Sequence, residues 1–252
     1  MENVIYWLGG SLIQWASSVA VGLPFVVVGV RAARAHGRDV SLVGLVQLFI
    51  FFFVSLALTR LGPALTFIRD PWQAMILEAV WALVFIFATR SISSAGLTFR
   101  ISSQAWWASL GVTALLLLFV VARGVLVKRL GVGPGETTPV VLEYLIYQLT
   151  MPGIAEELSY RGVIQPGLNA VLGRPWKILG APVGWGWVIT SVLFWAPHAF
   201  RVDSQMHLSF YWPTLTMQLV AGFVFGWLRE RTDSVFPAML AHNLVNVCWT
   251  LV

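Results

Sequence analysis

Residues 152–161 read Pro-Gly-Ile-Ala-Glu-Glu-Leu-Ser-Tyr-Arg and place three charged side chains inside apolar sequence. The carboxylates of Glu156 and Glu157 and the guanidinium of Arg161 interrupt a hydrophobic run that begins near Pro139. A charged group at membrane depth costs about 2.5–3.5 kcal/mol on insertion scales, so function is the default reason for keeping one there. The stretch therefore predicts a membrane-embedded chain with a functional site at these residues.

The composition supports the membrane assignment. The chain has 252 residues, of which 58% are hydrophobic and 11% are charged, whereas soluble globular proteins average about 25% charged residues. The net charge is +5, but the basic residues fall in short loops between apolar runs, which is a topology signal and not a nucleic-acid-binding surface. Their bias toward alternate loops predicts both termini outside the cytoplasm. We therefore expect a multi-pass integral membrane protein with the lipid bilayer as its surroundings and no nucleic-acid partner.

Apolar runs of about 20 residues, enough for one bilayer crossing, recur along the chain. Every backbone polar group must be satisfied within the span, so we expect these runs to be helices. The loops are too short for a soluble domain, which predicts one all-α, membrane-embedded domain over residues 1–252 with its motif-bearing core at about 139–252. The eight predicted spans are residues 5–30, 40–59, 72–89, 105–127, 139–160, 183–200, 209–228 and 235–252.

The spacing within residues 152–161 suggests a division of roles. Glu157 and Arg161 are four residues apart, with the acid first, so they share a helix face and can pair. Glu156 lies about 100° further around the helix and is left free to act as a general base. Pro152 and Gly153 interrupt the backbone hydrogen bonds, which bends the helix or opens space for a substrate beside the acid.

Two histidines fall in later apolar spans. His198 ends the segment Phe-Trp-Ala-Pro-His that begins at Phe194, and His242 stands four residues before Asn246. An imidazole and a carboxamide one turn apart can both donate hydrogen bonds to a developing oxyanion. Together with an acid that activates water and a histidine that holds the water, these groups predict a polar cavity inside the bundle suited to amide hydrolysis.

The three motifs occur in the order Glu-Glu-x-x-x-Arg, Phe-x-x-x-His and His-x-x-x-Asn. This order resembles the CPBP family of intramembrane endopeptidases, also called the ABI family, which contains the CAAX prenyl endopeptidases and bacteriocin-processing or immunity-associated relatives. The resemblance covers about residues 139–252 and implies an eight-helix endopeptidase, which we expect in a prokaryotic cytoplasmic membrane. It implies that Glu156 activates water with help from His198, that His242 and Asn246 stabilise the oxyanion, and that Glu157 and Arg161 are supporting residues.

Members of this family have been described both as zinc enzymes and as metal-independent glutamate proteases. The sequence lacks a His-Glu-x-x-His motif, and the neighbouring side chains of Glu156 and Glu157 point too far apart to chelate one ion easily. These observations favour a glutamate-type protease without a cofactor. A zinc site formed by Glu156, His198 and His242 from three helices is the alternative.

Four further residues in the apolar spans are expected to have structural roles. Glu78 and Glu143 are expected to lie near the ends of their spans as interfacial side chains, and Gly222 and Gly226 are expected to allow close helix packing.

The resemblance implies a membrane-anchored protein or peptide as substrate, with a CAAX-like, lipidated or sorting-signal tail, or a pheromone or bacteriocin precursor. The alternatives are a non-proteolytic scaffold or bacteriocin-immunity protein of the same fold, and a proton-coupled transporter in which Glu156 and the histidines relay protons.

Overall fold

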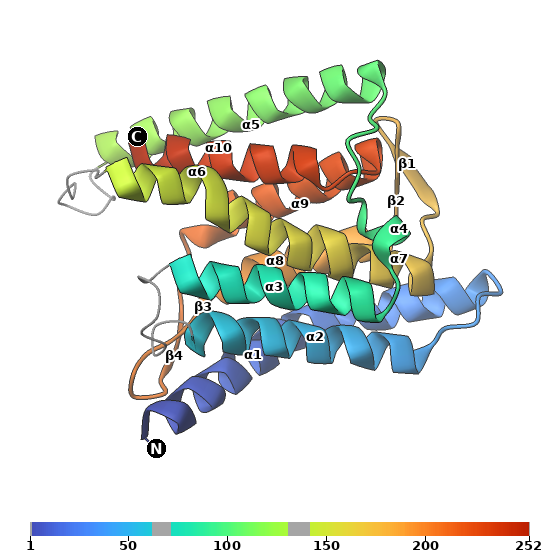
Figure 1. The fold of residues 1–252 in the computed structure, drawn as a ribbon, viewed down its shortest axis with the longest axis horizontal. Helices are drawn as coiled ribbons and strands as arrows, with labels where there is room; N and C mark the ends of the chain where they lie inside the picture. The colour runs from blue at the N-terminus through green and yellow to red at the C-terminus, as the bar shows by residue number, and fades with distance from the viewer. Residues whose placement is uncertain (1, 62–71, 131–141, 252) are drawn as a thin grey trace.

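The computed structural model describes residues 2–61, 72–130 and 142–251, and these residues form a bundle of long helices with two small hairpins (Figure 1). In chain order the helices are α1 Glu2–Ala35, α2 Leu42–Leu61, α3 Trp72–Ala88, α4 Ile92–Ala95, α5 Ser103–Arg129, α6 Leu142–Glu157, the π-helix η2 Leu158–Ile164, α7 Gln165–Leu172, α8 Trp185–Ala199, α9 Thr214–Thr232 and α10 Phe236–Leu251. The strands are β1 Trp176–Ile178, β2 Ala181–Val183, β3 Phe200–Val202 and β4 Leu208–Phe210.

Each predicted span contains a helix, and the predicted helical, membrane-like character is confirmed. Three helices in the part of the chain that the structure describes are long and apolar enough to cross a membrane: Trp7–Ala35, Leu42–Leu61 and Ser103–Arg129. The helix Trp72–Ala88 is apolar but shorter. Eight crossings therefore stay a prediction, and the start of the fifth predicted span, residues 139–141, lies outside the described residues.

Two predicted boundaries are wrong: the end of the fifth span at residue 160, and the start of the seventh at residue 209, where residues 208–210 form β4 and α9 begins only at Thr214. The fifth span does not end at residue 160, because α6 continues through η2 into α7 without a break. Arg161, the predicted partner of Glu157, is fully buried in η2 and pairs with Glu157 there. The stretch between the fifth and sixth predicted spans holds α7 and most of the antiparallel hairpin β1–β2.

The second hairpin, β3–β4, follows α8 directly and pairs Phe200 with Phe210. In its turn, Asp203 Oδ1 accepts the backbone N–H groups of His207 and Gln205, each at 2.9 Å, and these hydrogen bonds lower the pKa of Asp203. The end of α8 is also held from α1, because Gln14 Nε2 donates to Pro197 O at 2.7 Å and to Phe200 O at 2.9 Å. Carbonyls at a helix C-terminus lack intrahelical partners, so these bonds fix the turn of α8 that carries His198.

Glycines set how closely the motif-bearing helices approach. A Cβ at Gly222 would lie 3.1 Å from Ser191 O, and one at Gly226 would lie 2.6 Å from Trp187 Cδ1. The predicted close packing at the two glycines of α9 is therefore confirmed. Gly153 packs in the same way against α10, because a Cβ there would lie 2.6 Å from Met239 O. The space beside Gly153 is thus filled by α10 and is not open to a substrate.

Candidate active site

A cavity of about 170 Å³ lies among α1, α2, α3, α6, η2 and α8. It brings together Glu156, the predicted general base from α6, and His198, the predicted water-holding residue from the last turn of α8. The full lining consists of Gln14, Ser55, Leu56, Thr59, Met75, Glu78, Glu156, Tyr160, Pro197 and His198. The two predicted residues are more than 40 positions apart in sequence and meet because α8 packs against η2, the direct continuation of α6.

Glu156 and Glu157 point to different surroundings. Glu156 is half-buried and lines the cavity. Glu157 is fully buried, and its Oε1 accepts a hydrogen bond from Arg161 Nη1 at 3.1 Å and lies 2.9 Å from His242 Nδ1. The predicted pair of Glu157 and Arg161 is therefore present, and only the other carboxylate faces the cavity.

Arg161 connects this pair to two further helices. Its Nη2 donates to Gly222 O of α9 at 2.8 Å, and its guanidinium carbon lies 4.4 Å from the ring centroid of Phe194 of α8. A guanidinium presents several donors in a rigid plane and stacks on aromatic faces, so one side chain can hold several helices at once. Arg161 therefore fixes η2, α8 and α9 relative to one another.

The two histidines each use Nδ1 for a contact within the protein. Nδ1 of His198 lies 3.0 Å from Phe194 O, and Nδ1 of His242 lies 2.9 Å from Glu157 Oε1. A carbonyl or carboxylate oxygen only accepts, so Nδ1 must carry the proton in both hydrogen bonds. Nε2 of each ring is then left for a substrate, a water molecule or an ion.

His242 and Asn246 lie apart from the cavity. Neither is among the described residues that line it, and His242 is stacked on Phe225 with 4.9 Å between ring centroids. Asn246 is half-buried, and its backbone carbonyl accepts the hydroxyl of Thr250 at 2.8 Å. The structure thus places one predicted pair, Glu156 and His198, on the cavity and leaves the role of His242 and Asn246 as oxyanion donors a prediction.

The predicted zinc ligands do not fit one ion in this arrangement. Within the described ranges, no group of three His, Cys, Asp or Glu side chains is placed to hold a metal. Glu156 and His198 line the cavity, whereas His242 contacts Glu157. We therefore derive no catalytic step through a metal.

The interfacial interpretation of Glu78 is wrong. Its side chain is only 4% exposed and lines the same cavity as Glu156. Its place near the middle of the short apolar helix α3, six residues after Trp72, was the signal that could have identified it. Gln14 of α1 and Ser55 of α2 also line the cavity, so the three N-terminal helices form one side of the candidate site.

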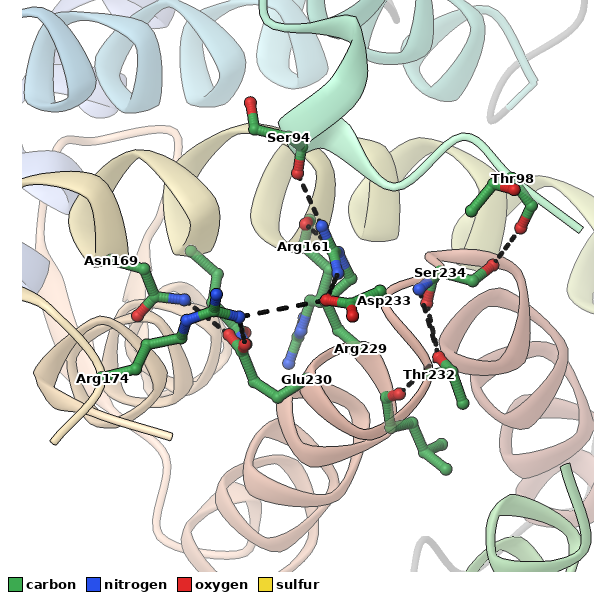
Figure 2. Close-up of polar contacts among 12 residues, drawn as sticks. Ser94, Thr98, Arg161, Asn169, Arg174, Arg229, Glu230, Thr232, Asp233 and Ser234 are labelled. Atoms are coloured by element: carbon green, nitrogen blue, oxygen red, sulfur yellow. Dashed lines mark hydrogen bonds and ion pairs between the residues drawn. The ribbon is translucent and has the colours of Figure 1, made fainter. Parts of the chain in front are cut away.

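A second group of buried charges lies at the end of α9 (Figure 2). Glu230 accepts hydrogen bonds from Gln165 Nε2 at 2.6 Å, from Asn169 Nδ2 at 2.5 Å and from Arg174 Nη1 at 3.0 Å. Arg229 donates to Ser94 O at 2.6 Å and to Arg161 O at 3.2 Å. We call Glu230 and its three donors, with Arg229, the α9-end cluster. It holds η2 and α7 against α9.

Comparison with known families agrees with the motifs. Residues 136–248 match the model of a family described as type II CAAX prenyl endopeptidase Rce1-like. Comparisons with curated proteins and with solved structures give no match. The matched range contains the three motifs and stops short of α1–α5, so it covers the part of the chain on which the resemblance was based. The predicted resemblance is therefore confirmed for residues 136–248, the part of the chain that the family model matches.

Proposed function

We propose that this protein is an intramembrane endopeptidase that hydrolyses a peptide bond near the C-terminus of a membrane-associated protein or peptide. The observation that carries the proposal is the cavity that Glu156 and His198 share inside the helical bundle. The family match over residues 136–248 supports a CAAX-type protease. The substrate class is a CAAX-like, lipidated or sorting-signal tail anchored in the same bilayer.

The proposed reaction uses Glu156 as general base. Its carboxylate takes a proton from a water molecule in the cavity, and the water oxygen attacks the scissile carbonyl carbon. His198, with Nδ1 donating to Phe194 O, presents Nε2 as an acceptor that orients this water. The Glu156 carboxylate faces the cavity without the arginine partner that Glu157 has, which suits it to the proton transfer.

The oxyanion would be stabilised by His242 and Asn246. Because Nδ1 of His242 is engaged by Glu157, only Nε2 can face the substrate, and it donates only when the ring carries both protons. Glu157 is then the counter-ion of that ring. This part of the proposal requires the substrate carbonyl to lie between the cavity and α10.

The test uses the purified protein in proteoliposomes with a farnesylated CAAX-type peptide that carries a fluorophore and a quencher on either side of the scissile bond. We expect cleavage by the wild type and a decrease of about 10²- to 10⁴-fold for Glu156→Gln, because general-base catalysis contributes about this factor. His198→Ala is expected to decrease the rate by a smaller factor. Glu143→Gln is the matched control, since Glu143 is an exposed carboxylate on the same helix, α6. Wild-type rates from Glu156→Gln would exclude that residue as the base.

A chelator separates the two protease classes. We expect the cleavage rate to be unchanged after treatment with a strong zinc chelator. Loss of activity that added zinc restores would contradict the glutamate-type mechanism. If the wild type cleaves neither prenylated nor lipidated nor unmodified peptides, the scaffold and transporter alternatives become the better descriptions.

A further inference from the structure

The cavity holds a second carboxyl group that the motifs do not include. Glu78 comes from α3, outside the family match at residues 136–248, and lines the cavity together with Glu156. It is 4% exposed, so its surroundings are as water-poor as those of the core. A carboxylate in such a place is expensive unless it is paired or functional.

The pairing that explains the other buried acids is not seen on this cavity. Glu157 has Arg161, and Glu230 has Arg174. Among the described residues that line the cavity there is neither lysine nor arginine. Two carboxyl groups in one water-poor space cannot both be charged at low cost, so one of the two is favoured to carry a proton. Glu78 is the more buried of the two and is the better place for that proton.

The hydroxyl group of Ser55 indicates that the cavity binds a polar ligand. Ser55 lines the cavity, is 4% exposed, and its Oγ has no hydrogen-bond partner among the described residues. Buried polar atoms are generally satisfied, so an orphan hydroxyl on a cavity wall indicates a missing polar partner. A water molecule or a substrate amide in the cavity would supply it.

We propose that Glu78 is a second catalytic carboxyl group of this site, which protonates the nitrogen of the leaving amine. This inference rests on the proposed function and adds a residue to it. The water oxygen forms a bond to the carbonyl carbon as Glu156 takes one water proton; the C–N bond then breaks as the nitrogen takes the proton of Glu78. The products are a carboxylic acid and an amine, with Glu156 protonated and Glu78 ionised. Transfer of the proton from Glu156 to Glu78 across the shared cavity restores the starting state.

The test compares two substrates that differ in the leaving group. One is the farnesylated CAAX-type peptide described above, and the other has an ester in place of its scissile amide. An amide nitrogen needs a proton before it can leave, whereas an ester oxygen depends on protonation much less. We therefore expect Glu78→Gln to decrease amide cleavage by about 10²-fold or more and ester cleavage by less than about tenfold. Glu156→Gln should decrease both, since both need activated water, and Glu143→Gln should change neither.

The ratio of amide to ester cleavage is measured on one sample, so it does not depend on how much of a variant is folded. Glu78→Asp keeps a carboxyl group and is expected to keep a ratio close to that of the wild type, even at a lower rate. An unchanged ratio in Glu78→Gln, or a low ratio in Glu78→Asp, would overturn the inference. If the wild type cleaves neither substrate, or Glu156→Gln cleaves both at the wild-type rate, the proposed function fails, and the assignment of Glu78 fails with it.

Discussion

Two regions of this molecule bury carboxylates in opposite ways. In the α9-end cluster, Glu230 is 3% exposed and receives three hydrogen bonds, one of them from Arg174 (Figure 2). On the cavity, Glu78 is equally buried and shares its space with Glu156, without a lysine or arginine among the described lining residues. The same side chain at the same depth is a structural brace in one region and a candidate reactant in the other.

The two regions differ in whether the free-energy cost of burying a carboxyl group is offset by a paired cation. A buried charge that is paired and hydrogen-bonded holds specific helices together, and removing one partner is strongly destabilising. A buried acid that faces a cavity without a cationic partner leaves this cost in the folded protein, which is typical of functional sites. The comparison therefore predicts that matched substitutions act on stability in the α9-end cluster and around Arg161, and on cleavage at the cavity.

The largest loss of stability is expected for Arg161→Met. The substitution leaves the fully buried Glu157 without its guanidinium partner and Gly222 O without its donor. Loss of one partner of a buried ion pair costs about 3–5 kcal/mol in free energy of unfolding. Thermal unfolding in detergent micelles measures this loss. The control is Arg34→Met, at an exposed arginine of α1, which should change the free energy of unfolding by less than about 0.5 kcal/mol. Equal losses in both variants would mean that Arg161 does not hold these helices together.

The same change at two glutamates tests the comparison directly. Glu230→Gln replaces one carboxylate oxygen with a donor among the donors of Gln165, Asn169 and Arg174, so one of these groups loses its acceptor. We expect a loss of about 1–3 kcal/mol in free energy of unfolding. Glu156→Gln is expected to change the stability by less than about 0.5 kcal/mol, while it abolishes most of the cleavage. A Glu156→Gln variant as unstable as Glu230→Gln would assign Glu156 to the framework of the fold.

The sequence predicted the helices and the pair of Glu157 with Arg161 because these depend on local spacing. Runs of about 20 apolar residues give membrane helices from composition alone, and the pairing of Glu157 with Arg161 follows from four residues of helix. The continuation of the helix through η2 was not predicted. Nor were the contacts of Arg161 with Gly222 O and Phe194, since these lie on distant helices. Glu78 was misassigned for a related reason: its neighbour Glu156 is 78 positions away in sequence, and only tertiary packing brings both carboxyls to one cavity.

Two buried serines, Ser234 and Ser55, allow the same comparison of the two regions with smaller expected changes in stability. Ser234, next to the α9-end cluster, is fully buried; its Oγ donates to Thr98 O at 2.6 Å and accepts the backbone N–H of Phe236 at 3.3 Å. Ser234→Ala removes both bonds and leaves two partly buried backbone groups with fewer partners. We expect it to lower the free energy of unfolding by about 1–2 kcal/mol, measured by thermal unfolding in micelles. A loss below about 0.3 kcal/mol would contradict the role of these bonds.

The smallest effect on stability is expected for Ser55→Ala, the matched change on the cavity wall. The Oγ of Ser55 has no hydrogen-bond partner among the described residues, so the substitution breaks no bond within the protein and removes a buried polar atom. The free energy of unfolding should change by less than about 0.5 kcal/mol, in either direction. If the hydroxyl binds water or the substrate amide, the same variant should raise KM or lower kcat for the farnesylated peptide while its unfolding temperature stays at the wild-type value. A loss of stability like that of Ser234→Ala, with unchanged cleavage, would mean that the cavity wall is built like the α9-end cluster, and the contrast between the two regions would no longer explain where the chemistry lies.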